Sequence, residues 1–148
     1  MCIRDRLSFG APTGPLGFIY REGEHRQPWF DALGDAPVFP AFHVFCGLAR
    51  GAGRHLVQAD SSDTQKVQCL AYRSGDGTTL WLANLTADNQ IVELSGNVGS
   101  GAIGVLDESS FVQACTDPRG FQAEWRPYAG GAITLAAYAV AFVAMTAH

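Results

Sequence analysis

A short charged segment at residues 21–29 gathers the side chains best suited to chemistry, and it directly follows an apolar run. Glu22 or His25 could act as a general base on water, and Arg21 could stabilise a developing oxyanion. Arg26 could do the same or hold a substrate, and Trp29 could stack on a sugar ring. We therefore predict catalytic candidates at Glu22, His25 and Arg21 and substrate-binding candidates at Arg26 and Trp29. The alternative is a solvated loop whose charges pair with one another.

Two other patterns suggest chemistry less strongly. The run at 99–104, Gly-Ser-Gly-Ala-Ile-Gly, matches the GxGxxG signature of dinucleotide sites, but a strand-like run follows where a helix should begin. We predict a glycine-rich turn there and no cofactor. His25, His43 and His55 lack the spacing of a metal site, so no metal is predicted. His43 is expected at the edge of an apolar helix face in a structural role. Asn84-Leu85-Thr86 has the form of a glycosylation sequon and is expected to close a strand.

The charged segment needs elements to position it. Residues 16–20 are apolar on both faces, which is typical of a strand covered on both sides, and a loop at 21–37 follows. Next comes a predicted helix that begins near Pro40 and ends at Gly51 or Gly53. An apolar stripe runs along that helix at i, i+3, i+4 and i+7: Phe42, Phe45, Cys46 and Ala49. A strand followed by a loop and a helix is the repeating unit of a (β/α)8 barrel, whose catalytic face lies after the strands.

From residue 54 onward the apolar period changes to two, which predicts strands. Segments 66–72 and 78–85 are joined by Ser-Gly-Asp-Gly, a sequence that favours a tight hairpin turn. Further strands are predicted at 91–94, 102–106 and 121–125, and the last two, 133–135 and 138–143, are expected to form a hairpin. Seven or eight strands at this spacing indicate an antiparallel β-sandwich.

Composition limits the functional classes. The 148 residues are 47% hydrophobic and 16% charged with a net charge of -4, which excludes a disordered chain and argues against nucleic-acid binding. Four scattered cysteines without a CxxC pair indicate free thiols and a reducing, cytoplasmic compartment, although two disulfides are possible by count. The apolar run at 132–147 is shorter than the ~20 residues of a membrane span, so no membrane partner is expected.

The combined pattern resembles a known family. A barrel-type strand, a charged loop, the helix Pro-Ala-Phe-His-Val-Phe at 40–45, and a sandwich containing Leu-Trp-Leu-Ala-Asn-Leu-Thr at 80–86 are similar to the C-terminal part of D-apionate lactonases. The resemblance implies a glycoside-hydrolase-like barrel followed by a C-terminal β domain. It also implies a parent enzyme that opens the ring ester of a sugar lactone.

These observations give one expected organisation. The fold class is mostly β: a C-terminal antiparallel β-sandwich at 54–148, preceded at 13–53 by the terminal strand-loop-helix unit of a (β/α)8 barrel. Residues 1–12 are expected to be artefactual or disordered, because 1–6 resemble a translated sequencing-adaptor tail found in environmental assemblies.

The expected function is that of a C-terminal fragment of a carbohydrate-active hydrolase, structural and inactive alone. Its partners would be the missing barrel in cis and a sugar-acid lactone or carbohydrate. One alternative is a non-catalytic carbohydrate-binding sandwich, with Trp29, Trp125 and Tyr128 as a stacking platform, or an accessory domain of a glycoside hydrolase. Another is an interaction domain with an apolar patch around Phe18, Phe42 and Phe45.

Overall fold

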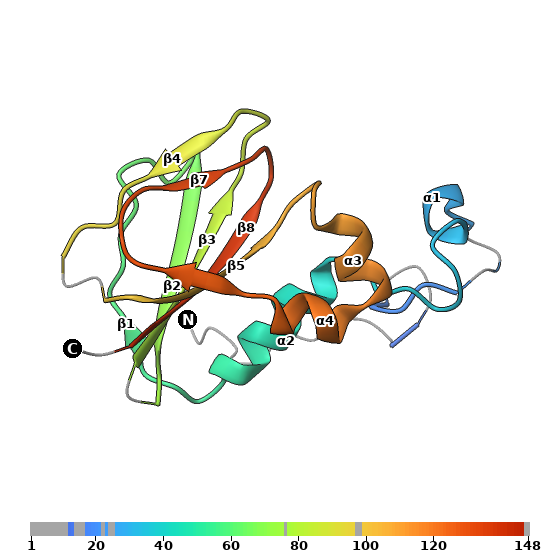
Figure 1. Cartoon of the computed structure of the whole chain (residues 1–148), viewed down its shortest axis with the longest axis horizontal. Coiled ribbons are helices and arrows are strands. Elements are labelled where there is room, and N and C mark those ends of the chain that lie inside the picture. The colour runs from blue at the N-terminus through green and yellow to red at the C-terminus, as the bar shows by residue number, and fades with distance from the viewer. Residues whose placement is uncertain are drawn as a thin grey trace, which may run out of the picture.

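The computed structural model describes residues 12–13, 17–21, 23, 26–75, 77–96 and 99–146. Its centre is a six-stranded antiparallel sheet in the order β1-β2-β3-β8-β5-β6, and β4 and β7 form a second, two-stranded sheet (Figure 1). The large sheet contains β1 (Leu56–Val57), β2 (Val67–Ser74), β3 (Gly77–Asn84), β8 (Val140–Thr146), β5 (Gly101–Leu106) and β6 (Arg126–Tyr128). The remaining elements are β4 (Gln90–Val92), β7 (Ile133–Leu135), α1 (Pro28–Asp31), α2 (Ala41–Gly51), α3 (Phe111–Thr116) and α4 (Pro118–Ala123).

The predicted mostly β fold with an antiparallel sandwich is confirmed. The hairpin of β2 and β3 forms in the predicted place, with Val67 opposite Asn84 and Ser74 opposite Gly77. Side chains alternate along β3, so Leu80 and Leu82 enter the core between the two sheets while Trp81 faces the other way. This alternation gives the large sheet two apolar faces.

One face is covered by the small sheet and the other by helices. The core between the sheets includes Leu82, Ile103, Val143 and Leu135. On the opposite face, Tyr72, Trp81 and Phe142 pack with Phe121 of α4 and with Val44 and Leu48 of α2. Figure 1 shows α2 and α4 on the side of the large sheet away from β4 and β7. The protein is therefore built as three layers.

The prediction of a strand at 121–125 is wrong, because residues 118–123 form helix α4. The Asp117 carboxylate accepts a hydrogen bond from the backbone N–H of Gly120 at 2.9 Å and caps the helix. Pro118 occupies the first turn, where its missing N–H costs nothing. This Asp-Pro start signal outweighs the alternating pattern that follows it.

The predicted C-terminal hairpin is also wrong. β7 pairs with β4 in the small sheet, whereas β8 lies between β3 and β5 in the large one. The chain crosses between the sheets at residues 136–139, where Tyr138 takes a positive φ of 55°. Its backbone N–H donates to Thr86 O at 3.1 Å, and Ala139 O accepts from Asn84 N at 2.9 Å. Backbone bonds to the end of β3 thus fix the crossing.

Residues 17–20, the described part of the strand predicted at 16–20, do not form a strand. Ile19 makes isolated bridges to Thr13 and Val38. Tyr20 N donates to Pro37 O, and Phe39 N donates to Phe18 O, both at 2.8 Å. The segment therefore pairs locally with residues 37–39, and the intervening loop contains the short helix α1.

Helix α2 confirms the predicted helix, but its apolar stripe has a different place. The side that meets the sheet carries His43, Gly47 and Gly51, one turn apart. A Cβ added to Gly51 would lie 2.7 Å from Cε1 of Tyr72, and one added to Gly47 would overlap the ring of Trp81. The predicted stripe, which begins at Phe42, lies on the side turned away from the sheet. Val44 and Leu48 of α2 also pack on this face of the sheet.

The glycines of the 99–104 run serve packing in a strand rather than a turn. Residues 101–106 form β5, and α3 begins only at residue 111. A Cβ at Gly101 would overlap Ala144 O, and one at Gly104 would overlap the indole of Trp125. The glycines thus allow close approach of a neighbouring strand and an aromatic ring, which explains the motif without a nucleotide.

The division predicted at residues 53/54 stays a prediction, although contacts cross it. Val38 N donates to Cys115 O at 2.9 Å, and α2 packs on the large sheet. Among the described helices, none combines the length and the apolar character needed to cross a bilayer.

Candidate functional site

The charged segment is only partly within the described residues. Glu22 and His25 lie outside them, so their predicted catalytic roles stay untested, as does that of Arg21, which is exposed. Trp29 belongs to α1 and is 83% exposed. α1 lies at the end of the molecule away from the sheets (Figure 1).

Asp31, which was not among the predicted site residues, connects Tyr20 and Arg26 within this segment. The Asp31 carboxylate accepts a short hydrogen bond from Tyr20 Oη and an ion-paired contact at 3.0 Å from Arg26 Nη2. Tyr20 Oη in turn accepts from the backbone N–H of Gln27 at 3.1 Å. The network ties the start of α1 to the buried ring of Tyr20. Its signal in the sequence was an acid three residues after Pro28, in the first turn of a helix.

The network also sets the charge of the segment. The hydrogen bond from Tyr20 is the largest cause that holds the pKa of Asp31 below its ordinary value of 3.8, and Arg26 acts in the same direction against partial desolvation. Asp31 is thus a carboxylate at neutral pH. Because Arg26 is paired with it, the predicted substrate-binding Arg26 is engaged within the protein.

His43 has the structural role that the sequence predicted. It is 4% exposed, and its Nε2 lies 2.8 Å from Ala114 O, a carbonyl oxygen that can only accept a hydrogen bond. Nε2 therefore carries the hydrogen, and Nδ1 can accept from Gln122 Nε2 at 3.4 Å. Burial lowers the pKa of His43, which the bond to Ala114 O only partly opposes. Both ring nitrogens are thus used to hold α2 against α3 and α4.

The aromatic side chains do not form the sugar platform considered above. Tyr128 is buried and donates to Gly131 O at 2.8 Å. Trp125 is half-buried and stacks on Phe142, with ring centroids 6.0 Å apart. Trp29 is the exposed ring of the three. The proposed apolar patch is also partly covered, since Phe18 packs edge-on against Phe45 at 4.9 Å.

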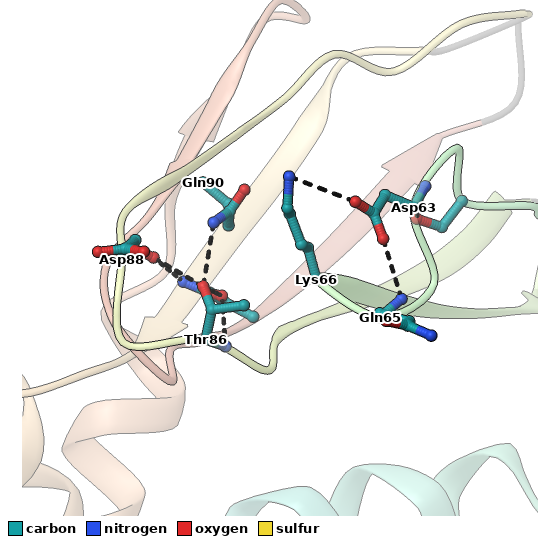
Figure 2. Close-up of polar contacts among 8 residues, drawn as sticks. Asp63, Gln65, Lys66, Thr86, Asp88 and Gln90 are labelled. Carbon is teal, nitrogen blue, oxygen red and sulfur yellow. Dashed lines mark hydrogen bonds and ion pairs between the residues drawn. The ribbon is translucent and has the colours of Figure 1, made fainter.

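A broad groove of about 1350 Å³ lies between β1, β2 and β4. It opens on the face of the large sheet that is turned toward the small sheet, opposite to the face covered by α2 and α4. Its floor includes Val67, Leu80 and Leu82, and its rim includes Asp63 and Lys66. Lys66 Nζ is 3.3 Å from the Asp63 carboxylate (Figure 2). None of its described lining residues is aromatic, so they offer no ring for stacking on a sugar.

Asn84 ends β3 and joins three segments. It is 3% exposed, and its Nδ2 donates to Asp88 O at 2.8 Å and to Ala136 O at 2.7 Å. Its Oδ1 accepts from the backbone and hydroxyl of Thr86, whose hydroxyl also accepts from Gln90 (Figure 2). The strand-end role predicted for the sequon is confirmed. Asn84 Nδ2, the atom to which a glycan would be attached, is used in hydrogen bonds within the protein.

Within the described ranges, no group of three His, Cys, Asp or Glu side chains is placed to hold a metal ion. Cys46, Cys69 and Cys115 are free thiols, as predicted. Burial raises the pKa of the Cys115 thiol to about 11, which keeps it protonated and unreactive.

Comparisons with known proteins bear on the sandwich. The family model for the D-apionate lactonase C-terminal immunoglobulin-like domain matches residues 64–143. A search of curated proteins found no match. Among solved structures, the chain is similar to a conserved exported protein from Bacteroides fragilis, with a TM-score of 0.43 and 14% identity. That match covers 60% of this chain and 17% of the other, so the chain spans about a sixth of that protein.

Proposed function

This chain belongs to the family of D-apionate lactonase C-terminal immunoglobulin-like domains, and from that membership we propose that its sandwich braces a sugar-lactone hydrolase without taking part in the chemistry. Opening a lactone ring ester requires an activated water or nucleophile and an oxyanion site. In our proposal those groups belong to a preceding barrel, and the sandwich fixes helix α2 and the charged segment that precedes it.

The seating of α2 on the large sheet carries this proposal. Gly47 and Gly51 allow the helix backbone to contact Trp81 and Tyr72. Both ring nitrogens of His43 form hydrogen bonds to the neighbouring helices α3 and α4. Arg50 Nη2 adds a bond of 2.7 Å to Gln122 Oε1. Contacts of this kind position a helix. They also leave His43 without a free nitrogen for general-base catalysis.

Two measurements on the 148-residue chain test the proposal. In a pH-stat assay with D-ribonolactone, we expect no hydrolysis above the buffer rate; a saturable enzymatic rate would refute the non-catalytic role. In hydrogen exchange, we expect α2 amides to be protected and to lose protection in Trp81→Leu. A control, Ile91→Ala, removes an exposed apolar side chain on β4 of the small sheet and should leave α2 protected. Unprotected α2 amides in the unmodified chain would refute the bracing role.

A further inference from the structure

The side-chain amide of Gln122 in α4 connects two basic side chains of α2. Its Oε1 accepts a hydrogen bond from Arg50 Nη2 at 2.7 Å, and its Nε2 lies 3.4 Å from Nδ1 of His43. A guanidinium can only donate, so the atom that Arg50 contacts must be the amide oxygen. The amide nitrogen is therefore turned toward His43, about two turns earlier in the same helix. The two basic side chains share an amide that has a single oxygen.

The neutral form of His43 fits this arrangement, whereas the protonated form does not. In the neutral ring, Nε2–H donates to Ala114 O at 2.8 Å and Nδ1 accepts from the Gln122 amide. A protonated ring carries a hydrogen on both nitrogens. Ala114 O can still accept from Nε2–H, but Nδ1–H would then face an amide N–H, which is also a donor. Protonation therefore leaves Nδ1–H without an acceptor unless Gln122 changes its orientation.

The surroundings of His43 supply no carboxylate for a protonated ring. A cavity of about 230 Å³ adjoins His43 between α2 and α4, and none of its described lining residues is acidic. The elements around it carry these titratable or charged groups: Arg50 of α2, Tyr72 of β2, Cys115 of α3, and Asp117, Arg119 and Glu124 at α4. The three groups at α4 are exposed and lie outside the cavity lining. Tyr72 Oη donates to a backbone carbonyl, and the buried Cys115 thiol is protonated at neutral pH. The Gln122 amide is therefore the neighbour placed to supply an oxygen.

We propose that the Gln122 amide is a pH-sensitive switch: when His43 gains a proton, the amide turns over, its oxygen accepts from His43 Nδ1–H, and Arg50 is released to solvent. His43 is 4% exposed, and a buried charged donor without an acceptor costs more than an exposed hydrogen bond contributes. Arg50 is exposed, so water can replace the amide oxygen at its guanidinium. Burial lowers the pKa of His43 from its ordinary value of 6.5, so the exchange is expected below that pH. The switch is independent of the bracing role, because α2 stays bonded to α4 in both states.

A pH titration of the 148-residue chain by nuclear magnetic resonance tests the exchange. Long-range ¹H–¹⁵N spectra give the protonation midpoint of His43, and side-chain spectra follow the Gln122 amide and the Arg50 guanidinium in the same samples. We expect the Gln122 and Arg50 signals to move with the midpoint of His43. The guanidinium of Arg119, exposed on α4 outside the cavity, should not follow that midpoint. Gln122 or Arg50 signals that stay still while His43 titrates, or unfolding of the chain before they move, would overturn the proposal.

Two substitutions at residue 122 separate a switch from a merely structural amide. Gln122→Met keeps the length of the side chain but removes the oxygen, so the His43 midpoint should fall by about one pH unit, a tenfold weaker proton affinity, and Arg50 should no longer respond. Gln122→Glu supplies two oxygens, so the midpoint should rise by at least about one unit while Arg50 stays bound. Gln65→Met, the first change made at an exposed position, should leave the midpoint unaltered. An unchanged His43 midpoint in both Gln122 variants would overturn the proposal.

Discussion

The backbone of Gly47 in α2 lies against the six-membered ring of Trp81 in β3 so closely that a Cβ at residue 47 would overlap the ring atoms Cζ2 and Cη2. A glycine inside a helix normally weakens it by roughly 0.5–1 kcal/mol relative to alanine. Here the same glycine lets α2 approach the large sheet. The helix and the sheet face are therefore matched to each other.

Gly47→Ala is expected to destabilise the protein by about 1–3 kcal/mol, because overpacking outweighs the gain in helix propensity. The free energy of unfolding, measured by denaturant titration, checks this. In the Trp81→Leu background the smaller side chain makes room, so Gly47→Ala should there be neutral or stabilising. A stabilising Gly47→Ala in the unmodified protein would contradict the packing described.

Stability should fall as pH drops below about 6.5, through His43. Burial lowers its pKa from 6.5, so the unfolded chain binds the proton first and the stability present at neutral pH is lost toward acid. The slope is at most about 1.4 kcal/mol per pH unit for one group. Unfolding free energies between pH 8 and 5 measure it. His43→Gln should reduce the slope and His55→Gln, at an exposed position, should keep it; equal slopes in both would contradict this origin.

Asn84→Ala should cost about 1–3 kcal/mol, since Asp88 O and Ala136 O lose their amide donor in a buried place. Asn84→Asp is expected to be at least as damaging, because a carboxylate cannot donate to those carbonyls. Thermal unfolding checks both, with exposed Asn89→Ala as the control near the wild-type midpoint. A wild-type midpoint in Asn84→Ala would show that the junction tolerates its loss.

The carboxyl of Asp31 should titrate below 3.8 in carbon-detected NMR. Tyr20→Phe should raise the pKa more than Arg26→Gln, because the hydrogen bond from Tyr20 is the larger cause and Arg26 is mostly exposed. The stabilisation from this network is present above pH 3.8 and is lost as pH falls through the lowered pKa. A larger effect from Arg26→Gln would reverse this ranking.

Local signals in the sequence predicted the local elements. The Ser-Gly-Asp-Gly turn and the period of two located β2 and β3, and Pro40 with the glycines bounded α2. α4 was predictable in principle, since Asp117-Pro118 is a helix-start signal, but the alternation after it was given more weight.

Pairings between distant segments could not be predicted from local patterns. β7 and β8 join different sheets because Asn84 and Thr86, some fifty residues earlier, bind the crossing between them. The contact side of α2 was missed because it combines the two glycines with Val44 and Leu48, which lie outside the predicted stripe. In the charged segment, Arg26 and Trp29 were noticed for their chemistry, whereas Tyr20 and Asp31 give the segment its order.

The seating of α2 has a practical consequence for protein engineering. The rings of Tyr72, Trp81 and Phe142 pack against both α2 and α4. A graft of residues 54–146 onto another enzyme would lack α2 and would expose these rings. Such a wide aromatic surface invites self-association. A transplanted sandwich should therefore begin at Val38, whose backbone N–H donates to Cys115 O, so that α2 is included and continues to cover these rings.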